Sequence, residues 1–395
     1  MRYHRRATVV CCVMLLSCPL SALHSVAQAP AAAVLETPSA DVLTADEWER
    51  VDGSVDRALA WLASQQQRDG SFPTLPHGQP AVTSLCVLAF MAHGHLPGEG
   101  PYGETVQRGV DYIISCQKQN GLLALVAPNG PTMSRAVSHA VGYPLCYNHA
   151  IGALVLSETY AMEGAERAKA VEPVIEKALR ATLEMQNWPK DHEVDQGGWR
   201  YLDDNGDVDS DLSITGWQLM FLRSAKNAGF DVDEEPIARG VEYVRRCFRE
   251  DIKRFTYMLV PEDRSTRAMS GAGVLALAHS GLHNTREAQV AGDFLLQAQF
   301  DTYNAPGRGQ THIDDSERYH YALLTCSQAM YQLGGRHWEE FFPPMVKVLL
   351  DAQAADGSWA PESNHNDTPF GNAYTTAIGV IALGAPNQLL PIFQR

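Results

Sequence analysis

Five aspartates fall within the nine residues from Asp203 to Asp211, the stretch of the chain whose residue types could most directly do chemistry. Closely spaced Asp and Asn side chains around a glycine turn supply the hard oxygen ligands that calcium prefers. No glutamate closes this set, and its glycine does not stand where an EF-hand loop has one. We therefore predict no metal, and keep calcium as an alternative with the ligands Asp203, Asn205, Asp207 and Asp209.

The end of the same stretch also has a purely structural interpretation. Asp211 and Ser213 stand at the start of an apolar run that begins with Leu212. A carboxylate or hydroxyl at that point accepts a free backbone N–H of the first helical turn, and a negative charge there suits the helix dipole. Helix capping and calcium binding therefore compete for the same residues.

The elements that must position these residues are helices. From about residue 44, apolar residues recur at helical spacing and predict six helix pairs. The first helix of each pair is amphipathic and the second is apolar and rich in small residues, so we expect outer and inner helices. The outer set is predicted at about 47–66, 104–118, 170–187, 235–250, 285–299 and 338–353, and the inner set at about 80–93, 146–162, 212–228, 268–280, 318–333 and 373–384.

One phrase occurs near both ends of the chain: an apolar helix, a glutamine, Asp-Gly-Ser and an aromatic residue. It runs from Gln66 to Phe72 in the first unit and from Gln353 to Trp359 in the last. Such self-similarity indicates stacked repeats, and a glutamine at a helix end can bond backbone groups of the next unit. An open stack would need polar capping repeats. We therefore predict a closed ring, an all-α (α/α)6 toroid, over residues 44–395.

In such a ring, the N-terminal ends of the inner helices converge on a central cavity, which is the default ligand site. A histidine near a helix start is also commonly a structural group. Arg267 could pair with Asp209 or Asp211 instead of an anionic ligand. The residues predicted to contact a substrate are Tyr147, His149, Tyr201, Trp217, Arg267, Tyr319, Tyr321 and Tyr374.

The Gln-x3-Gly-x-aromatic phrases resemble the QW-type repeats of terpene cyclases and of the related protein prenyltransferase β-subunits. More specifically, the segments from Gln196 to Tyr201 and from Asp211 to Gln218 look like the prenyltransferase/squalene oxidase repeat proteins of planctomycete-type bacteria. The resemblance covers about residues 50–395. It implies a toroid fold, while a fold by itself does not fix an activity.

Cyclases of the squalene–hopene type carry an Asp-x-Asp-Asp-Thr motif whose central Asp protonates an alkene. Here Asp209-Ser210-Asp211-Leu212-Ser213 keeps the two spaced aspartates and has Leu212 in place of the third. The resemblance implies that Asp211 is the proton donor, that Asp209 is its partner, and that aromatic side chains surround a cation. It further implies an acid-catalysed cyclase or isomerase of an isoprenoid or lipid. In that interpretation, Asp211→Asn abolishes cyclisation and leaves the melting temperature nearly unchanged.

Two other functions stay open. One is a non-catalytic toroid that binds a peptide, glycan or lipid. The other is a polysaccharide lyase or hydrolase, because helical toroids also host sugar chemistry. A deep aromatic pocket favours the cyclase, a shallow groove lined by Arg267, His149 and His320 favours the sugar enzyme, and a cavity filled by side chains favours the binding protein.

The start of the chain resembles an export signal. A basic beginning, the apolar run from Ala7 to Leu16 and small residues before Pro30 predict a signal peptide at 1–29, followed by a linker at 30–43. We expect a periplasmic or extracellular protein, with lipoprotein anchoring at Cys18 as an alternative. Membrane-surface association and the oligomeric state are left open, and no integral membrane segment is expected.

The composition narrows the choice of partner. The net charge is −15, which argues against a nucleic-acid binder because phosphate binding needs clustered Lys and Arg. The sequence shows no Cys/His cluster with zinc spacing, and no cofactor is expected. The expected ligand is an apolar or isoprenoid small molecule.

Overall fold

The computed structural model describes residues 38–134, 137–160, 162, 164–202, 209–260, 264–298, 300–305 and 317–395. The predicted signal peptide, Cys18 and residues 30–37 of the predicted linker lie outside these ranges. So do three of the four alternative calcium ligands, Asp203, Asn205 and Asp207.

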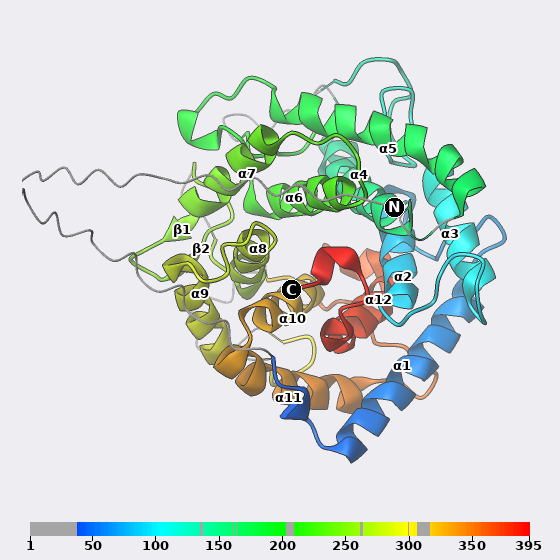
Figure 1. Cartoon of the computed structure of the whole chain (residues 1–395), viewed down its shortest axis with the longest axis vertical. Coiled ribbons are helices and arrows are strands. Elements are labelled where there is room, and N and C mark those ends of the chain that lie inside the picture. The colour runs from blue at the N-terminus through cyan, green and yellow to red at the C-terminus, as the bar shows by residue number, and fades with distance from the viewer. Residues whose placement is uncertain are drawn as a thin grey trace, which may run out of the picture. The chain divides into compact units, whose positions relative to one another are not determined.

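Twelve α-helices, arranged as six outer and inner pairs, build the described part of the chain (Figure 1). The outer helices are α1 (Ala45–Gln65), α3 (Gly103–Ser115), α5 (Ala165–Gln186), α7 (Glu234–Arg246), α9 (Arg286–Gln297) and α11 (Gly335–Ala352). The inner helices are α2 (Ala81–Met91), α4 (His139–Tyr160), α6 (Leu212–Asn227), α8 (Arg267–Ala278), α10 (Tyr319–Leu333) and α12 (Gly371–Leu383). Between α7 and α8 lies a two-stranded antiparallel hairpin of β1 (Phe248–Arg249) and β2 (Arg254–Phe255).

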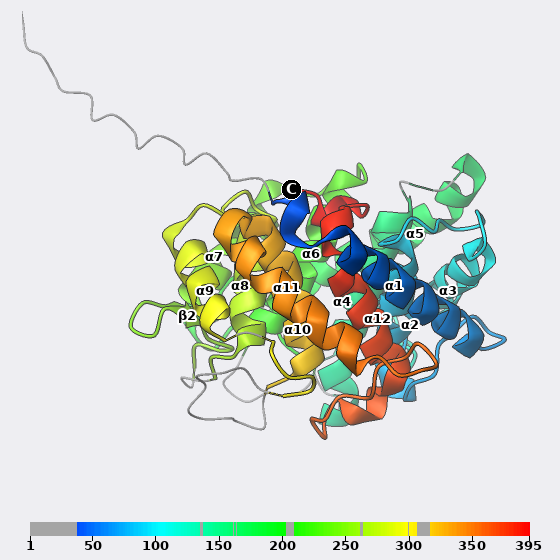
Figure 2. The same cartoon turned by 90° about the horizontal axis from the view of Figure 1, so that it is seen from below.

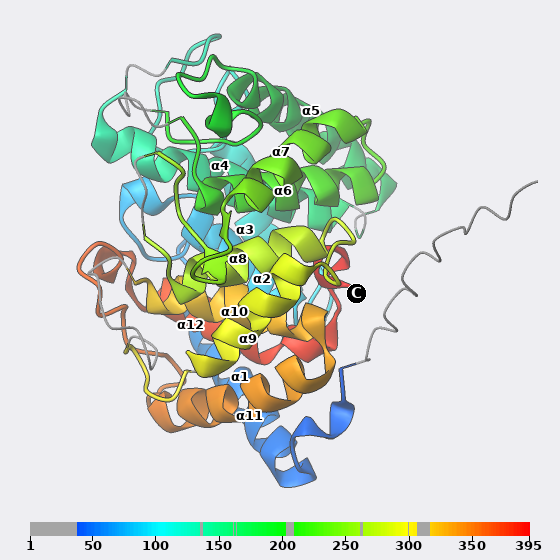
Figure 3. The ribbon, with the colours of Figure 1, turned by 90° about the vertical axis from the view of Figure 1, so that its left-hand side faces the viewer.

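The inner helices form a closed ring. Each packs against the next in chain order, and α12 packs against α2. The outer helices cover them: α11 and α1 lie outside α10 and α12 (Figure 2), and α7 and α9 lie outside α6 and α8 (Figure 3). The predicted (α/α)6 toroid is therefore confirmed. None of the described helices combines the length and the apolar character that crossing a membrane requires.

The patterning of the sequence explains which helices are inside. Every residue of α2 and every residue of α8 is buried, because neighbouring helices surround them on all sides. The outer helix α7, by contrast, buries one stripe that includes Ile237, Val241 and Val244 at helical spacing. The prediction of outer and inner sets therefore followed from hydrophobic periodicity.

The repeated glutamine is a joint between neighbouring units. In four units its side-chain amide donates to two carbonyl oxygens, one on the glycine four or more residues later and one on the next outer helix. The pairs of acceptors are Gly70 and Thr105 for Gln66, Gly121 and Val174 for Gln117, Gly197 and Pro236 for Gln186, and Gly357 and Ser54 for Gln353. The last joint connects α11 to α1, so the ring closes through the same contact that builds it.

The aromatic residue of the phrase completes the joint. Phe72, Trp199 and Trp359 are fully buried. Each donates its backbone N–H to a threonine hydroxyl on the following inner helix, at 3.0–3.1 Å. The threonines are Thr83, Thr215 and Thr376. The joint therefore ties an outer helix both to the next outer helix and to its own inner partner.

The end of the chain covers the C-terminal ends of the inner helices. The short 3-10 helix Pro391–Phe393 lies at the centre of the ring, near the C-terminus in Figure 1. Its Ile392 N–H donates to the Glu158 carboxylate at 3.2 Å, and the Gln332 amide donates to the Phe393 carbonyl at 2.6 Å. One end of the ring is thereby closed by protein.

Glu158 should make this closure sensitive to pH. Burial raises its pKa from 4.5 to about 7, while hydrogen bonds from Ser224 and the Ile392 N–H act in the opposite direction. A carboxyl group whose pKa is higher in the folded state binds more protons there, so its contribution to stability is present below pH 4.5 and is lost as the pH rises through 7. The loss amounts to about 3 kcal/mol of unfolding free energy.

Urea unfolding at pH 5 and pH 8 tests this expectation. Glu158→Gln, which resembles the protonated side chain, should remove most of the difference between the two pH values. Glu172→Gln on the exposed surface of α5 is the matched control and should behave as the parent protein. Equal pH dependence in the Glu158→Gln variant and the parent would contradict the assignment.

Candidate functional site

A cavity of about 330 Å³ lies at the other end of the ring, among the N-terminal parts of the inner helices. Its floor is apolar and buried, and each floor residue stands about one helical turn beyond a residue that lines the upper wall. These floor residues are Leu85, Ile151, Trp217, Leu324 and Ile378.

Six tyrosines form the wall above this floor: Tyr143, Tyr147, Tyr201, Tyr257, Tyr321 and Tyr374. Their rings contact one another, as for Tyr143 and Tyr201, whose centroids lie 4.8 Å apart. The Tyr147 hydroxyl donates to Ser213 Oγ, which in turn donates to the Tyr321 hydroxyl, both at 3.0 Å. Burial raises the pKa of all six phenols, so they stay protonated and serve as hydrogen-bonding groups and aromatic faces.

Three arginines and one aspartate bring charge to the cavity wall: Arg200, Arg264, Arg318 and Asp367. The Arg200 and Arg264 guanidinium carbons lie 5.3 and 5.1 Å from the centroid of the Tyr257 ring. Arg318 Nε lies 3.5 Å from the Asp367 carboxylate. Arg264 is exposed and Arg200 and Arg318 are partly exposed, whereas Asp367 and the floor residues are buried.

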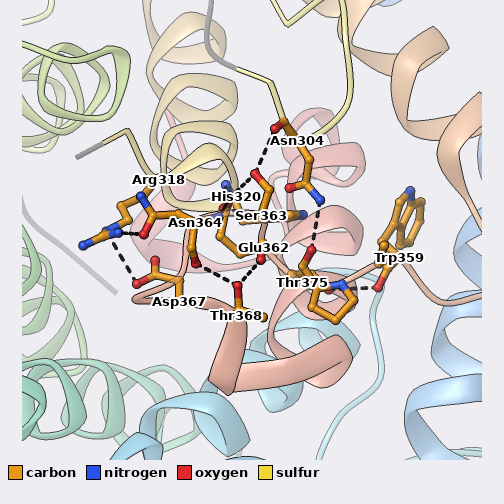
Figure 4. Close-up of polar contacts among 12 residues, drawn as sticks. Asn304, Arg318, His320, Trp359, Glu362, Ser363, Asn364, Asp367, Thr368 and Thr375 are labelled. Atoms are coloured by element: carbon orange, nitrogen blue, oxygen red, sulfur yellow. Dashed lines mark hydrogen bonds and ion pairs between the residues drawn. The ribbon is translucent and has the colours of Figure 1, made fainter. Parts of the chain in front are cut away.

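Asp367 is held by a network that fixes the loop at residues 360–370 (Figure 4). Glu362 accepts the His320 backbone N–H at 2.9 Å, and His320 Nδ1 lies 2.8 Å from the same oxygen. The Thr368 hydroxyl donates to the Glu362 carbonyl at 2.6 Å, directly beside Asp367. Arg318 contacts both Asn364 and Asp367. The carboxyl group therefore enters the cavity from a firmly anchored loop.

The environment of Asp367 suits proton transfer. Burial raises its pKa from 3.8 to about 6, Arg318 opposes the shift, and the negative charge of Glu362 adds to it. A group that titrates near neutral pH can both give and take a proton under physiological conditions. Within the described lining of the cavity, Asp367 is the carboxyl group with this property.

Asp211 lies behind the cavity wall, and its carboxylate is already engaged. One oxygen accepts the Ile214 N–H at 2.8 Å and so caps α6, and the other lies 2.7 Å from Arg200 Nη1. Burial raises the pKa of Asp211, and both the Arg200 charge and the capping N–H favour its carboxylate form. Asp209 also lies outside the cavity lining; its carboxylate accepts the Asp191 N–H at 2.7 Å.

Of the eight predicted substrate-contacting residues, five line the cavity: Tyr147, Tyr201, Trp217, Tyr321 and Tyr374. Four of them come from four different inner helices, α4, α6, α10 and α12, and Tyr201 comes from the loop before α6. The other three, His149, Arg267 and Tyr319, lie away from the cavity lining.

His149 occupies the joint position that threonine fills in other units. Its Nδ1 accepts the Leu123 N–H at 3.2 Å, and its Nε2 lies 3.0 Å from the Thr182 hydroxyl. Burial lowers the pKa of His149 to about 3, so the ring is neutral. These contacts give His149 a structural role in the joint between neighbouring units.

Arg267 points between helices and not into the ring. Its partner is Glu317, with Nε 3.5 Å from the carboxylate, and neither Asp209 nor Asp211. The guanidinium carbon lies 4.1 Å from the centroid of the Phe300 ring. Tyr319 packs on the same Phe300 ring, at a centroid distance of 5.4 Å. Both residues therefore belong to the contact between α8, α10 and the loop after α9.

The sequence-based set did not include Asp367, Arg200, Arg318 or Tyr257. All four stand in loops or at helix boundaries, where hydrophobic periodicity carries no information. Within the described ranges, no three His, Cys, Asp or Glu side chains gather closely enough to hold a metal ion.

The chain matches no protein-family model, and no curated protein matches it in sequence. Solved structures do resemble it in fold. A glycosidase variant superposes with a TM-score of 0.59 at 13% identity, covering 88% of this chain and 100% of the other. A sugar epimerase from a ruminal bacterium gives 0.59 at 13% identity, with 86% and 98% covered.

A third similar structure is a variant of the type II terpene cyclase MstE from Scytonema in complex with merosterolic acid A. It gives a TM-score of 0.51 at 14% identity and covers 89% of this chain and 100% of the other. Proteins with such different activities share the architecture alone. The chain is thus an α/α toroid protein by fold, and the comparisons carry no reaction over to it.

Proposed function

We propose that this protein is an exported enzyme that isomerises or cyclises a small isoprenoid or lipid-like molecule in the central cavity, with Asp367 as its acid and base. The observation that carries the proposal is the layering of the site: an apolar floor, a ring of six tyrosines above it, and one carboxyl group at the level of the arginines. The apolar part of such a ligand fits against the floor, and its reacting polar group fits next to Asp367.

The pKa of Asp367 restricts the reaction. Protonating an unactivated alkene demands a much stronger acid than a carboxyl group that titrates near 6. An aldehyde, ketone or epoxide oxygen is a better proton acceptor. Asp367 would protonate that oxygen, positive charge would develop on carbon facing the tyrosine rings, and loss of a carbon-bound proton would return Asp367 to its starting state.

Turnover of defined compounds tests the proposal. The full protein would be incubated with farnesal and with an epoxide of farnesol, and the products analysed by gas chromatography and mass spectrometry. The expected result is a product of unchanged mass and altered skeleton or double-bond position. Recovery of both compounds unchanged, with no change in tryptophan fluorescence on their addition, would contradict the proposal.

Asp367→Asn should abolish this turnover. Removing an acid–base group costs about 100-fold or more in kcat. Asn keeps the shape of the side chain, so ligand binding, followed by calorimetry, should change little. Asp351→Asn on the outer helix α11, where the carboxylate pairs with Lys347, is the matched control and should be fully active. Equal activity of the Asp367→Asn and Asp351→Asn variants would overturn the role of Asp367.

A sugar-active enzyme is the second candidate. Tyrosine faces, Trp217 and the Asn148 amide in one cavity also suit a sugar ring, which stacks on aromatic faces and bonds through its hydroxyls. Several of the similar structures are named as sugar-active enzymes: a glycosidase, a sugar epimerase and an alpha-1,6-mannanase. Quenching of tryptophan fluorescence by cellobiose or mannotriose, without quenching by farnesal, would favour this candidate.

A further inference from the structure

We infer that His320 is a positioning residue of the site, a doubly protonated imidazole ring that clamps the loop at residues 360–370 and so holds Asp367 in the cavity. The inference rests on the proposed function for the role of Asp367, and it adds the group that controls where Asp367 lies. His320 itself is fully buried and lies outside the cavity lining.

Two neighbouring loops meet at His320, which is the second residue of α10 (Figure 4). One is the loop at residues 300–305, after α9, and the other is the loop at residues 360–370. The loops are also bonded to each other directly. The Asn304 amide donates to the Pro361 carbonyl at 2.9 Å, and the Ser363 hydroxyl donates to the Asn304 carbonyl at 3.0 Å.

The Nδ1 side of the ring faces Glu362. Nδ1 lies 2.8 Å from Glu362 Oε2, which also accepts the His320 backbone N–H at 2.9 Å. Burial by itself raises the pKa of Glu362, but the hydrogen bonds and the charge of His320 outweigh it, so the pKa lies below its usual range. An ionised carboxylate can only accept hydrogen bonds, so Nδ1 must donate.

The Nε2 side of the ring faces Tyr303, with 2.9 Å between Nε2 and the hydroxyl oxygen. Burial raises the pKa of Tyr303, so the hydroxyl keeps its single proton. The hydroxyl donates that proton to the Ala360 carbonyl at 2.8 Å, because a carbonyl oxygen can only accept. The hydroxyl oxygen must therefore accept from Nε2. Both ring nitrogens of His320 carry a proton, and the ring is a cation.

The same reasoning gives the opposite result for the buried His149. Its Nδ1 accepts the Leu123 N–H, so this nitrogen carries no proton. The Thr182 hydroxyl, 3.0 Å from Nε2, donates to the Gln218 amide oxygen at 2.9 Å, so Nε2 donates to Thr182. His149 is therefore neutral, in agreement with its pKa, which burial lowers to about 3. The hydrogen-bond partners of the two buried rings determine their different charges.

The charge of His320 is balanced by Glu362. A position near the start of a helix disfavours a cation, and the Glu362 carboxylate, which accepts from both the ring and the backbone, offsets this. The rings of Tyr319 and Tyr374 also lie near, at centroid distances of 5.1 and 6.3 Å. Further charged groups on the surrounding elements are Asp301 and two ion pairs, Arg267 with Glu317 and Arg318 with Asp367.

Loss of one ring proton must break a contact of this clamp of His320, Glu362 and Tyr303. Without the proton on Nε2, the single hydroxyl proton of Tyr303 cannot serve both His320 and Ala360. Without the proton on Nδ1, a lone pair faces the Glu362 carboxylate. A histidine ordinarily changes its charge between about pH 5 and 8. The clamp should therefore be closed at the acidic end of this range and open as the pH rises.

Nitrogen-15 NMR of the full protein, labelled in its histidine rings, measures the charge directly. His320→Gln identifies the His320 signals by their loss, and Tyr303→Phe identifies them a second time by their shift. At pH 5.5 we expect two protonated ring nitrogens in His320 and one in His149. A single ring proton on His320 at this pH would overturn the inference.

Hydrogen exchange followed by mass spectrometry, corrected for the effect of pH on intrinsic exchange rates, measures the clamp. Protection of the loop at residues 360–370, relative to the joint at residues 66–72, should fall about tenfold or more as His320 loses its second proton. In Tyr303→Phe, Nε2 has no acceptor, so the fall should occur at lower pH.

Tyr331→Phe is the matched control, because Tyr331 lies on α10 as well and packs on Trp338 away from the clamp. It should show the pH dependence of the parent protein. Protection that does not follow the charge of His320, or equal profiles for Tyr303→Phe and Tyr331→Phe, would overturn the positioning role.

The inference and the proposed function can fail separately. The kcat for farnesal should fall together with loop protection on the alkaline side, and at lower pH in Tyr303→Phe. Asp367 titrates near 6, in the same range. Asp367→Asn should therefore lose turnover but keep the His320 titration. No turnover by the parent protein, with the expected NMR and exchange, would overturn the proposed reaction and leave the clamp standing. Turnover that persists after the loop is released would overturn the link between the clamp and Asp367.

Discussion

Asp211→Asn is expected to lower the free energy of unfolding by about 3–5 kcal/mol. The substitution removes the negative charge that pairs with Arg200 at 2.7 Å and leaves a largely buried guanidinium without a carboxylate partner. Asparagine is itself a good N-cap, so the bond to the Ile214 N–H should survive, and the loss reports the ion pair. Urea unfolding followed by circular dichroism measures the effect.

A double-mutant cycle isolates the pair. Arg200→Met alone should also destabilise the protein, since it strands a buried carboxylate. The double variant with Asp211→Asn should be more stable than the sum of the two single effects predicts, because no unpaired charge remains. The acid-donor interpretation of Asp211 expects a nearly unchanged melting temperature. An unchanged melting temperature together with lost turnover would therefore refute the ion-pair role and restore Asp211 as the acid.

Gly70→Ala is expected to be among the most damaging single-methyl changes in the scaffold, costing about 4 kcal/mol or more. Gly70 has a φ of +93°, and a Cβ there would lie 2.2 Å from the Arg108 carbonyl oxygen on α3. The backbone of one unit touches the backbone of the next at this point, so neither side can yield without breaking the joint made by Gln66.

Gly229→Ala provides the matched control. Gly229 has the same φ of +93°, but a Cβ there would meet nothing within 4 Å. Its cost of about 1 kcal/mol measures the backbone strain alone. The difference between the two variants in urea unfolding is therefore the cost of the steric contact in the joint. Similar destabilisation by both substitutions would show that the contact with Arg108 contributes nothing.

The fold was predictable because the sequence features that determine it recur at regular spacing. The spacing of apolar residues separated the outer from the inner helices, and the repeated phrase at Gln66 and Gln353 located the joint that closes the ring. The helix starts were less predictable. Helix α4 begins at His139 and not near residue 146, and it carries Pro144, a residue that usually breaks a helix interior, as its sixth residue.

The site was predictable only where side chains repeat along helices. Tyr321 lines the cavity, whereas Tyr319 and His320 do not, since adjacent helical residues point about 100° apart. The sequence shows the run Tyr319-His320-Tyr321 but does not show which of its side chains faces the cavity. No sequence pattern identifies Asp367 as a site residue. Its position depends on loop contacts that involve Arg318, Asn364 and Glu362 and form only in the folded ring.

The joint between α11 and α1 has a consequence for how the protein folds and unfolds. Ser54 and Gln353 are 299 positions apart. The outer helix α1 of the first unit is therefore covered by α11 only after nearly the whole chain has been synthesised. Contacts of such sequence separation form slowly, and until then apolar helix faces at both open edges are exposed to aggregation. Once closed, the ring has no end unit from which fraying can begin. We therefore expect a chain that needs protection during synthesis and then unfolds slowly, as a whole.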